Sequence, residues 1–167
     1  LLRHPLLFMD VSGQQVRAGS SWFNAGEVDA VMSVLRILER AGVSWCDVGI
    51  ITPYVGQVNA LRERVLAHGI PMERELDLDR DGNQAQQGLA MGTVHRFQGG
   101  ERRVVIFSTV ATQLRSLRFL NGRVNLTNVA VSRAREHLIV IGARHCLREG
   151  TYTRLLVDQG ESISLTS

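Results

Sequence analysis

The chain has 167 residues, of which 44% are apolar and 21% are charged, and this size and composition predict one globular domain over residues 1–167. All 19 basic residues are arginine, which excludes a phosphate-loop lysine, a Schiff-base lysine and a lysine general base. The sequence has no apolar run of transmembrane length and no leader that resembles a signal peptide, so we expect no membrane association. Its two cysteines lie far apart without metal-ligand spacing, which favours a reduced, cytoplasmic compartment. Since the chain begins with Leu1 rather than Met, we expect a fragment of a larger protein.

Apolar runs and stretches of helical spacing predict alternating strands and helices in the first half of the chain. Asn24 is a typical helix N-cap, and Glu27 lies three residues later, as in a capping box. Glycines end both predicted helices. In chain order the predicted elements are a strand over residues 6–11, a loop over 12–23, a helix from Ala25 to Gly42, a strand over 48–52, and a helix to Gly69 with Val55, Val58, Leu61 and Val65 on its apolar face.

The second half contains further apolar strands and a long polar stretch. Residues 73–88 are acidic, rich in glutamine and without periodicity, which predicts a loop. This loop contains Asp77, Asp79 and Asp81 at the spacing of a calcium-binding loop, but the twelfth position is Gly88 instead of the required glutamate, so we predict no metal site. The other predicted elements are strands over 89–93, 103–108 and 138–142, a turn over 97–101, a short helix capped by Asn125, and a terminal helix within 147–157.

Apolar strands that alternate with amphipathic helices predict an α/β fold with a parallel sheet covered on both faces. Ligands on such sheets bind at the carboxyl ends of the strands. We therefore expect functional residues at three places that follow strands, namely Thr52–Tyr54, Thr93–Glu101 and the segment after Ile141.

Three segments carry a much stronger signal together than any of them carries alone. Residues 50–57 read Ile-Ile-Thr-Pro-Tyr-Val-Gly-Gln, residues 92–101 read Gly-Thr-Val-His-Arg-Phe-Gln-Gly-Gly-Glu, and residues 128–135 read Asn-Val-Ala-Val-Ser-Arg-Ala-Arg. In this order they resemble motifs IV, V and VI of the second RecA-like domain of superfamily 1 helicases, in the branch related to nonsense-decay and replication-associated helicases. The resemblance covers roughly residues 6–143.

The resemblance implies a RecA-like three-layer fold, with a mostly parallel central sheet and helices on both faces. It also implies that Glu101 belongs to the nucleotide site, where its carboxylate would accept hydrogen bonds from ribose hydroxyls. A strand-entry turn with an exposed glutamate is the alternative. The implied nucleic-acid contacts are Thr52, Tyr54, Thr93 and His95; the implied nucleotide contacts are Gln98, Gly99, Glu101 and Arg133; and the implied catalytic residue is Arg133.

Arg133 also has a distinctive position on its predicted helix. Counted at 100° per residue, it returns to the face of Leu126, Val129 and Ala130. A guanidinium on an apolar stripe needs an anionic partner or a route to solvent. An arginine finger meets this need, because its planar and permanently charged fork reaches a γ-phosphate across a domain cleft. The alternative is an arginine that merely suits a helix C-terminus, a role that Arg135 fills equally well.

Charge is unevenly distributed along the chain. Residues 94–148 contain ten arginines and two acids, a balance of +8, whereas the rest of the chain carries −5. A basic half predicts a polyanionic partner, and a solvated basic surface is the alternative. Together with the motif resemblance, this charge predicts single-stranded nucleic acid as the partner, with DNA favoured over RNA.

The resemblance further implies which half of an ATPase is present. The phosphate loop and the acidic magnesium-binding segment belong to the first RecA-like domain of the same protein, and this sequence contains neither. We therefore expect ATP with Mg²⁺ in the intact protein, no tightly bound cofactor in this fragment, and no ATPase activity of the fragment alone. The alternatives are a non-catalytic α/β module that binds nucleic acid or a protein, and a generic nucleotide-binding enzyme, which the absent glycine fingerprint disfavours.

Overall fold

The central sheet of the computed structural model has six strands, and all neighbouring strands in it are parallel, which confirms the predicted α/β class. The structure describes residues 2–73, 88–94, 97, 100–122 and 124–164. The strand order is β5-β4-β6-β7-β1-β8. These strands are β1 (Leu6–Asp10), β4 (Val48–Thr52), β5 (Ala90–Thr93), β6 (Arg102–Ser108), β7 (Ala134–Gly142) and β8 (Glu161–Ile163).

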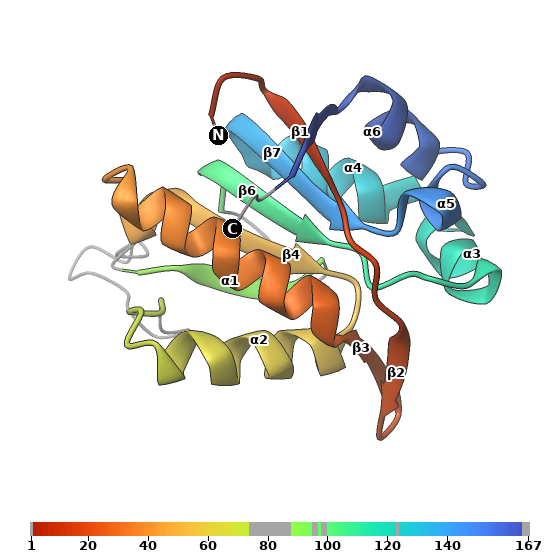
Figure 1. Cartoon of the computed structure of the whole chain (residues 1–167), viewed down its shortest axis with the longest axis horizontal. Helices are drawn as coiled ribbons and strands as arrows, with labels where there is room; N and C mark the ends of the chain where they lie inside the picture. The colour runs from red at the N-terminus through yellow and green to blue at the C-terminus, as the bar shows by residue number, and fades with distance from the viewer. Residues whose placement is uncertain (1, 74–87, 95–96, 98–99, 123, 165–167) are drawn as a thin grey trace.

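Helices cover both faces of this sheet and make the three layers that the sequence predicts (Figure 1). Side chains alternate along each strand, so Val104 and Ile106 of β6 face one layer while Val105 and Phe107 face the other. Strands that are apolar on both faces are what a doubly covered parallel sheet requires. One layer contains α1 (Ala25–Arg40) and α2 (Val55–Ala67), and the other contains α3 (Leu114–Gly122), α4 (Val124–Arg133), α5 (Arg144–Leu147) and α6 (Thr153–Gln159).

The ends of α1 and α2 confirm the helix boundaries predicted from capping residues. The Asn24 side chain accepts a hydrogen bond from the backbone N–H of Glu27. Gly42 and Gly69 follow the two helices with φ of 73° and 69°, which glycine adopts without a steric cost. The predicted apolar face of α2 is buried except for Val55, which is 56% exposed because it starts the helix beyond the end of the sheet.

The predicted loop over residues 12–23 is instead largely an antiparallel hairpin, so this prediction was wrong. The hairpin consists of β2 (Gln15–Ala18) and β3 (Ser21–Asn24), joined by a two-residue turn that contains a glycine with φ of 59°. β3 lacks the alternation of apolar and polar residues that identifies a half-buried strand, and β2 alternates over only four residues, with Gln15 buried and Val16 exposed. The hairpin packs on α2, where a Cβ on Gly56 would lie 2.7 Å from the carbonyl oxygen of Trp22.

Several predicted boundaries in the C-terminal half were also wrong. Asn125 lies inside α4, which begins at Val124, and α3 was not predicted at all. β7 is longer than the predicted strand 138–142, because three of its first four residues are polar and only its buried end shows in the apolar pattern. The terminal helix predicted within 147–157 is replaced by α5 and α6, and β8 then pairs with β1.

Some sequence predictions concern residues outside the described part of the chain. These are most of the acidic loop, with its three spaced aspartates, together with His95, Gln98 and Gly99. Within the described ranges, no helix is long and apolar enough to cross a membrane. No group of three or more His, Cys, Asp or Glu side chains among the described residues is arranged to hold a metal ion.

Candidate nucleotide and nucleic-acid sites

The sheet separates the predicted site residues into two groups at its opposite edges. Thr52 and Thr93 are the last residues of β4 and β5 and are direct partners in the pairing of these strands, so both lie at the carboxyl edge. Glu101 immediately precedes β6 and Arg133 immediately precedes β7. Because the strands are parallel, residues that precede a strand lie at the amino edge. The expectation that segment 93–101 lies entirely at the carboxyl ends was therefore wrong for Glu101.

The segment between Thr93 and Glu101 connects these two edges. It leaves the carboxyl end of β5 and enters the amino end of β6, and β4 lies between these two strands. Val94 and Phe97 are buried in the same core as α3 and α4, so both of these side chains lie on that face of the sheet. Phe97 fits there because residue 49 is glycine: a Cβ on Gly49 would lie 2.6 Å from Phe97 Cζ.

Arg102 holds the backbone at the point where this segment enters β6. Only 3% of its side chain is exposed, and its Nη2 lies 2.5 Å from Oε2 of Glu73. Its Nη1 donates a hydrogen bond to the backbone carbonyl of Glu101 at 3.1 Å. Glu101 itself is exposed. The backbone of Glu101 is therefore fixed while its carboxylate remains accessible to a ligand.

Arg133 differs from the other partly or fully buried arginines in the described part of the chain. Arg102, Arg103 and Arg144 each have a carboxylate oxygen nearby, at 2.5, 2.7 and 3.6 Å. Arg133 is half-buried and has no such partner among the described residues, and its Nε, like that of Arg102, is buried without a hydrogen bond. Leaving a buried guanidinium nitrogen unpaired costs free energy in a folded domain. The arrangement is typical of a cation that meets an anion from outside the domain.

The helix face predicted for Arg133 is confirmed. On α4, Leu126 and Ala130 are buried and Val129 packs against the same core. Arg135, by contrast, is exposed at the start of β7. The two arginines of this motif therefore have different surroundings, and Arg133 is the one held against the protein.

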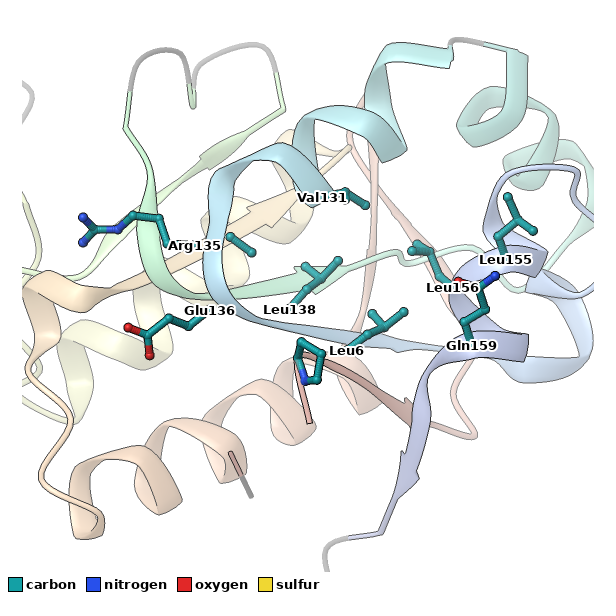
Figure 2. A pocket seen from close by; sticks show the side chains of 10 residues that line it. Leu6, Val131, Arg135, Glu136, Leu138, Leu155, Leu156 and Gln159 are labelled. Carbon is teal, nitrogen blue, oxygen red and sulfur yellow. The ribbon is translucent and has the colours of Figure 1, made fainter. Parts of the chain in front are cut away.

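A mainly apolar hollow of about 350 Å³ lies beside the start of β7 (Figure 2). Arg135 and Glu136 contribute to its rim, and Figure 2 shows their charged groups pointing away from the leucines. The hollow therefore offers no cation to a phosphate. Its apolar lining residues are Pro5, Leu6, Val131, Ala134, Leu138, Leu155 and Leu156.

At the carboxyl edge the candidate side chains are unequally exposed. Thr52 is fully buried, and its Oγ1 has no hydrogen-bond partner among the described residues. Thr93 is half-buried. The ring of Tyr54 lies against Phe119 of α3, with the ring centroids 5.4 Å apart, and burial raises the pKa of its hydroxyl, which is hydrogen-bonded to Ser116. Thr93 and Tyr54 thus reach the surface, while Thr52 is buried beneath the surface with a hydroxyl that has no hydrogen-bond partner among the described residues.

Sequence reasoning missed a buried polar network centred on Glu27. Oε2 of this fully buried side chain accepts hydrogen bonds from Ser108 Oγ at 2.7 Å and from the Val110 backbone N–H at 2.9 Å. Burial raises the pKa of the carboxyl from 4.5 to about 7, although these hydrogen bonds act in the opposite direction. Val110 has φ of 65°, which is rare for a β-branched residue. The Glu27 carboxyl therefore holds a strained turn directly after β6.

Gln57 joins this network to the first turn of α2. Its Oε1 accepts a hydrogen bond from the Asn24 backbone N–H at 2.8 Å, and its Nε2 donates to Ser108 Oγ at 2.9 Å. In a capping box the glutamate side chain would accept the N–H of Asn24. Here Gln57 accepts it, and Glu27 turns toward β6 instead. Gln57 belongs to the segment that resembles motif IV, but no sequence pattern shows that it meets Asn24 and Ser108.

Residues 2–145 of the chain match the family model described as an AAA domain. The chain is 33% identical over 164 residues to the probable RNA helicase armi of Drosophila melanogaster, covering 92% of this chain and 12% of that protein. It is 33% identical over 154 residues to the RNA helicase Mov10l1 of Homo sapiens, covering 86% of this chain and 11% of that protein. It is 30% identical over 145 residues to the 5'-3' DNA helicase ZGRF1 of Mus musculus, covering 86% of this chain and 7% of that protein.

The chain thus spans only 7–12% of the length of these three relatives. Among solved structures, it is similar to the C-terminal domain of a possible DNA helicase from Lactobacillus plantarum, with 17% sequence identity and a TM-score of 0.49 over 83% of this chain and 73% of that chain. The family match covers most of the chain, and these relatives carry the name of helicases. The chain belongs to the AAA domain family and is a homologue of superfamily 1 helicases, as its three motifs predict.

Proposed function

We propose that this chain is one half of the motor of an ATP-dependent superfamily 1 helicase, and that it supplies motifs IV, V and VI to an ATPase cleft completed by a first RecA-like domain. The observation that carries the proposal is the half-buried guanidinium of Arg133, which has no carboxylate partner among the described residues. In this role Arg133 is the arginine finger. Its fork meets the γ-phosphate of ATP held by the other domain and stabilises the charge of the transition state.

The residues of this chain fit the ribose and the phosphates of ATP better than they fit its metal ion. Arg133 offers unpaired donors to a phosphate, and the exposed Glu101 offers an acceptor to ribose hydroxyls. Gln98 and Gly99 complete the proposed nucleotide contacts on the side of motif V. The phosphate-loop lysine is assigned to the first RecA-like domain because this chain contains no lysine at all. The Mg²⁺ ligands are assigned to the same domain because the helicase resemblance implies that the acidic magnesium-binding segment lies there.

The second part of the proposal is a contact with single-stranded nucleic acid at the carboxyl edge. Thr93 and Tyr54 reach the surface there, His95 follows Thr93 in the same motif, and the unpaired hydroxyl of Thr52 lies beneath them. A translocating enzyme has to hold the sugar-phosphate backbone, because this is the feature that every nucleotide shares. Two of the relatives are named as RNA helicases and one as a DNA helicase, so they do not support the expected preference for DNA.

Fluorescence anisotropy with labelled oligonucleotides of unrelated sequence, both DNA and RNA, tests this contact. We expect weak binding with a slope of log affinity against log salt of about 0.7 per phosphate, reflecting only a few phosphates. Thr93→Ala and His95→Ala are expected to weaken binding to a similar extent on every sequence. Ser44→Ala, which removes an exposed hydroxyl before the amino end of β4, is the control. Tight, salt-insensitive binding to a single sequence would contradict the proposal and favour a dedicated binding module.

A further inference from the structure

The outer face of α3 carries two arginines and an aromatic ring that none of the three motifs includes. We propose that this face extends the nucleic-acid surface: Phe119 stacks on an unpaired base, and Arg115 and Arg118 bind the neighbouring phosphates. This inference rests on the proposed function, because it adds a second set of contacts to the same carboxyl edge.

The position of α3 places it at this edge. The helix starts at Leu114, shortly after β6 ends at Ser108, and Figure 1 shows it beyond the carboxyl ends of the strands. Tyr54, which follows β4, is in contact with it: the Tyr54 and Phe119 rings are tilted by 32° with centroids 5.4 Å apart. The Tyr54 hydroxyl is hydrogen-bonded to Ser116 of the same helix. The motif IV tyrosine and α3 therefore form one continuous surface.

Helical geometry separates the residues of α3 into a buried and an exposed face. Arg118 and Phe119 lie three and four residues after Arg115, so the Cβ atom of each is about 5–6 Å from that of Arg115. Both arginines are exposed, and Phe119 is 37% exposed. The opposite face is buried in the core and consists of Ser116, Leu117 and Leu120.

The charge of this face fits a polyanion. Neither α3 nor the preceding residues 109–113 contain an acidic residue. Arg115 and Arg118 have no ion pair or hydrogen bond within the described structure, whereas the exposed Arg64 and Arg154 each bind an aspartate. Cations beside an aromatic ring are the combination with which proteins bind single strands, because bases stack on the ring while the phosphates bind the cations. The ring requires unpaired bases, so the inferred ligand is a single strand rather than a duplex.

The test uses the 167-residue chain with a labelled oligothymidylate and a labelled oligouridylate at low salt. Phe119→Leu keeps an apolar side chain but removes the ring, and we expect its dissociation constant to rise about ten-fold. Phe119→Trp keeps a stacking surface, so it should retain the affinity, and its added fluorescence should be quenched by the oligonucleotide. Replacing both Arg115 and Arg118 by Gln should lower the salt slope by about 1.4, at 0.7 per lost phosphate contact. Replacing both Arg40 and Arg62 by Gln, two exposed arginines on α1 and α2, is the charge-matched control and should change neither quantity.

The outcomes separate this inference from the proposed function. If Thr93→Ala weakens binding while the Phe119 and arginine variants bind like the unmodified chain, the inference about α3 is overturned and α3 faces a protein instead. If the unmodified chain binds neither oligonucleotide at low salt, both proposals are overturned. A cooperative thermal melt is recorded for every variant. If Phe119→Leu fails to fold, the exposed arginine pair decides the question.

Discussion

The carboxyl group of Glu27 is subject to two opposing influences. Burial favours the neutral acid, while the hydrogen bonds from Ser108 and Val110 favour the carboxylate, and burial dominates to raise the pKa to about 7. Between about pH 4.5 and pH 7 the folded chain therefore binds more protons than the unfolded chain. Its stability falls as the pH rises through this range, so the contribution of Glu27 is fully present below about pH 4.5 and is lost above about pH 7.

The variant Glu27→Gln removes this titration while keeping the shape of the side chain. From pH 5 to pH 8 we expect the unfolding free energy of the unmodified chain, relative to the variant, to fall by about 3 kcal/mol, since each pKa unit corresponds to about 1.4 kcal/mol. Urea unfolding at several pH values measures this difference. Glu39→Gln, an exposed change on the same helix, should show no such trend. A difference that stays constant with pH would mean that Glu27 remains ionised throughout.

Residue roles that depend on local spacing could be predicted from the sequence, and roles that depend on distant contacts could not. The cap at Asn24 and the helix face of Arg133 follow from residues within one or two turns. The hydrogen bond from Ser108 to Glu27 joins residues 81 positions apart, and the Gln57 amide joins α2 to Ser108 and to the Asn24 backbone. No periodic pattern in the sequence predicts a contact between residues so far apart.

At the scale of elements, the connection from β5 to β6 is the feature that relates the two sites. This segment links the carboxyl edge, with Thr93, to the amino edge, with Glu101, and it is anchored by Phe97. The anchor depends on the absence of a side chain at Gly49, whose Cβ would lie 2.6 Å from the Phe97 ring. A change in β4 is therefore expected to act on motif V through packing alone.

Gly49→Ala tests this packing, because it forces either the Phe97 ring or the strand to move. We expect it to lower the unfolding free energy by about 1–3 kcal/mol, as overpacking does in other cores. Phe97→Leu should relieve the clash, so the double variant should lose less stability than the sum of the two single changes. Gly122→Ala is the control, since a Cβ there meets no atom within 4 Å. Purely additive losses in urea unfolding would show that Phe97 does not rest on Gly49.

The elements that sequence patterns identified are those buried on at least one face. The apolar strands and the long helices α1 and α2 were predicted correctly, because burial imposes a clear period on their residues. The β2–β3 hairpin escaped prediction because most of its residues are exposed or only partly buried. α3 was missed although Leu114, Leu117 and Leu120 recur at helical spacing, because it is only nine residues long. α3 also begins without a capping side chain, using the backbone carbonyl of Gln113 for its first hydrogen bonds.

At the scale of the whole molecule, the two proposed sites lie at opposite edges of one rigid sheet. The nucleotide residues Glu101 and Arg133 are at the amino edge, and the proposed nucleic-acid contacts are at the carboxyl edge. A sheet buried on both faces transmits a movement without deforming. Closure of an ATPase cleft at one edge would therefore move the nucleic-acid surface at the other edge as a rigid body.

The purified 167-residue chain is expected to hydrolyse no ATP above background, with or without oligonucleotides. The physical reason is that it contains no lysine with which to build a phosphate loop, so under the proposal it supplies only the arginine of the cleft. Phosphate release under steady-state conditions measures this. Sustained turnover that nucleic acid stimulates would show that the chain contains a complete ATPase site, contrary to the proposal.

The most direct test of the central claim is the ATPase rate of the full natural polypeptide that contains this domain, with Arg133→Ala compared with Arg135→Ala. We predict that Arg133→Ala lowers kcat by about 10³-fold or more, leaves the Kd of ATP nearly unchanged and keeps a cooperative thermal melt. Arg135→Ala, which removes an exposed arginine from the same motif, should leave kcat close to that of the unmodified protein. An unchanged kcat for Arg133→Ala, or a loss of activity that follows the loss of its cooperative melt, would contradict the arginine-finger role.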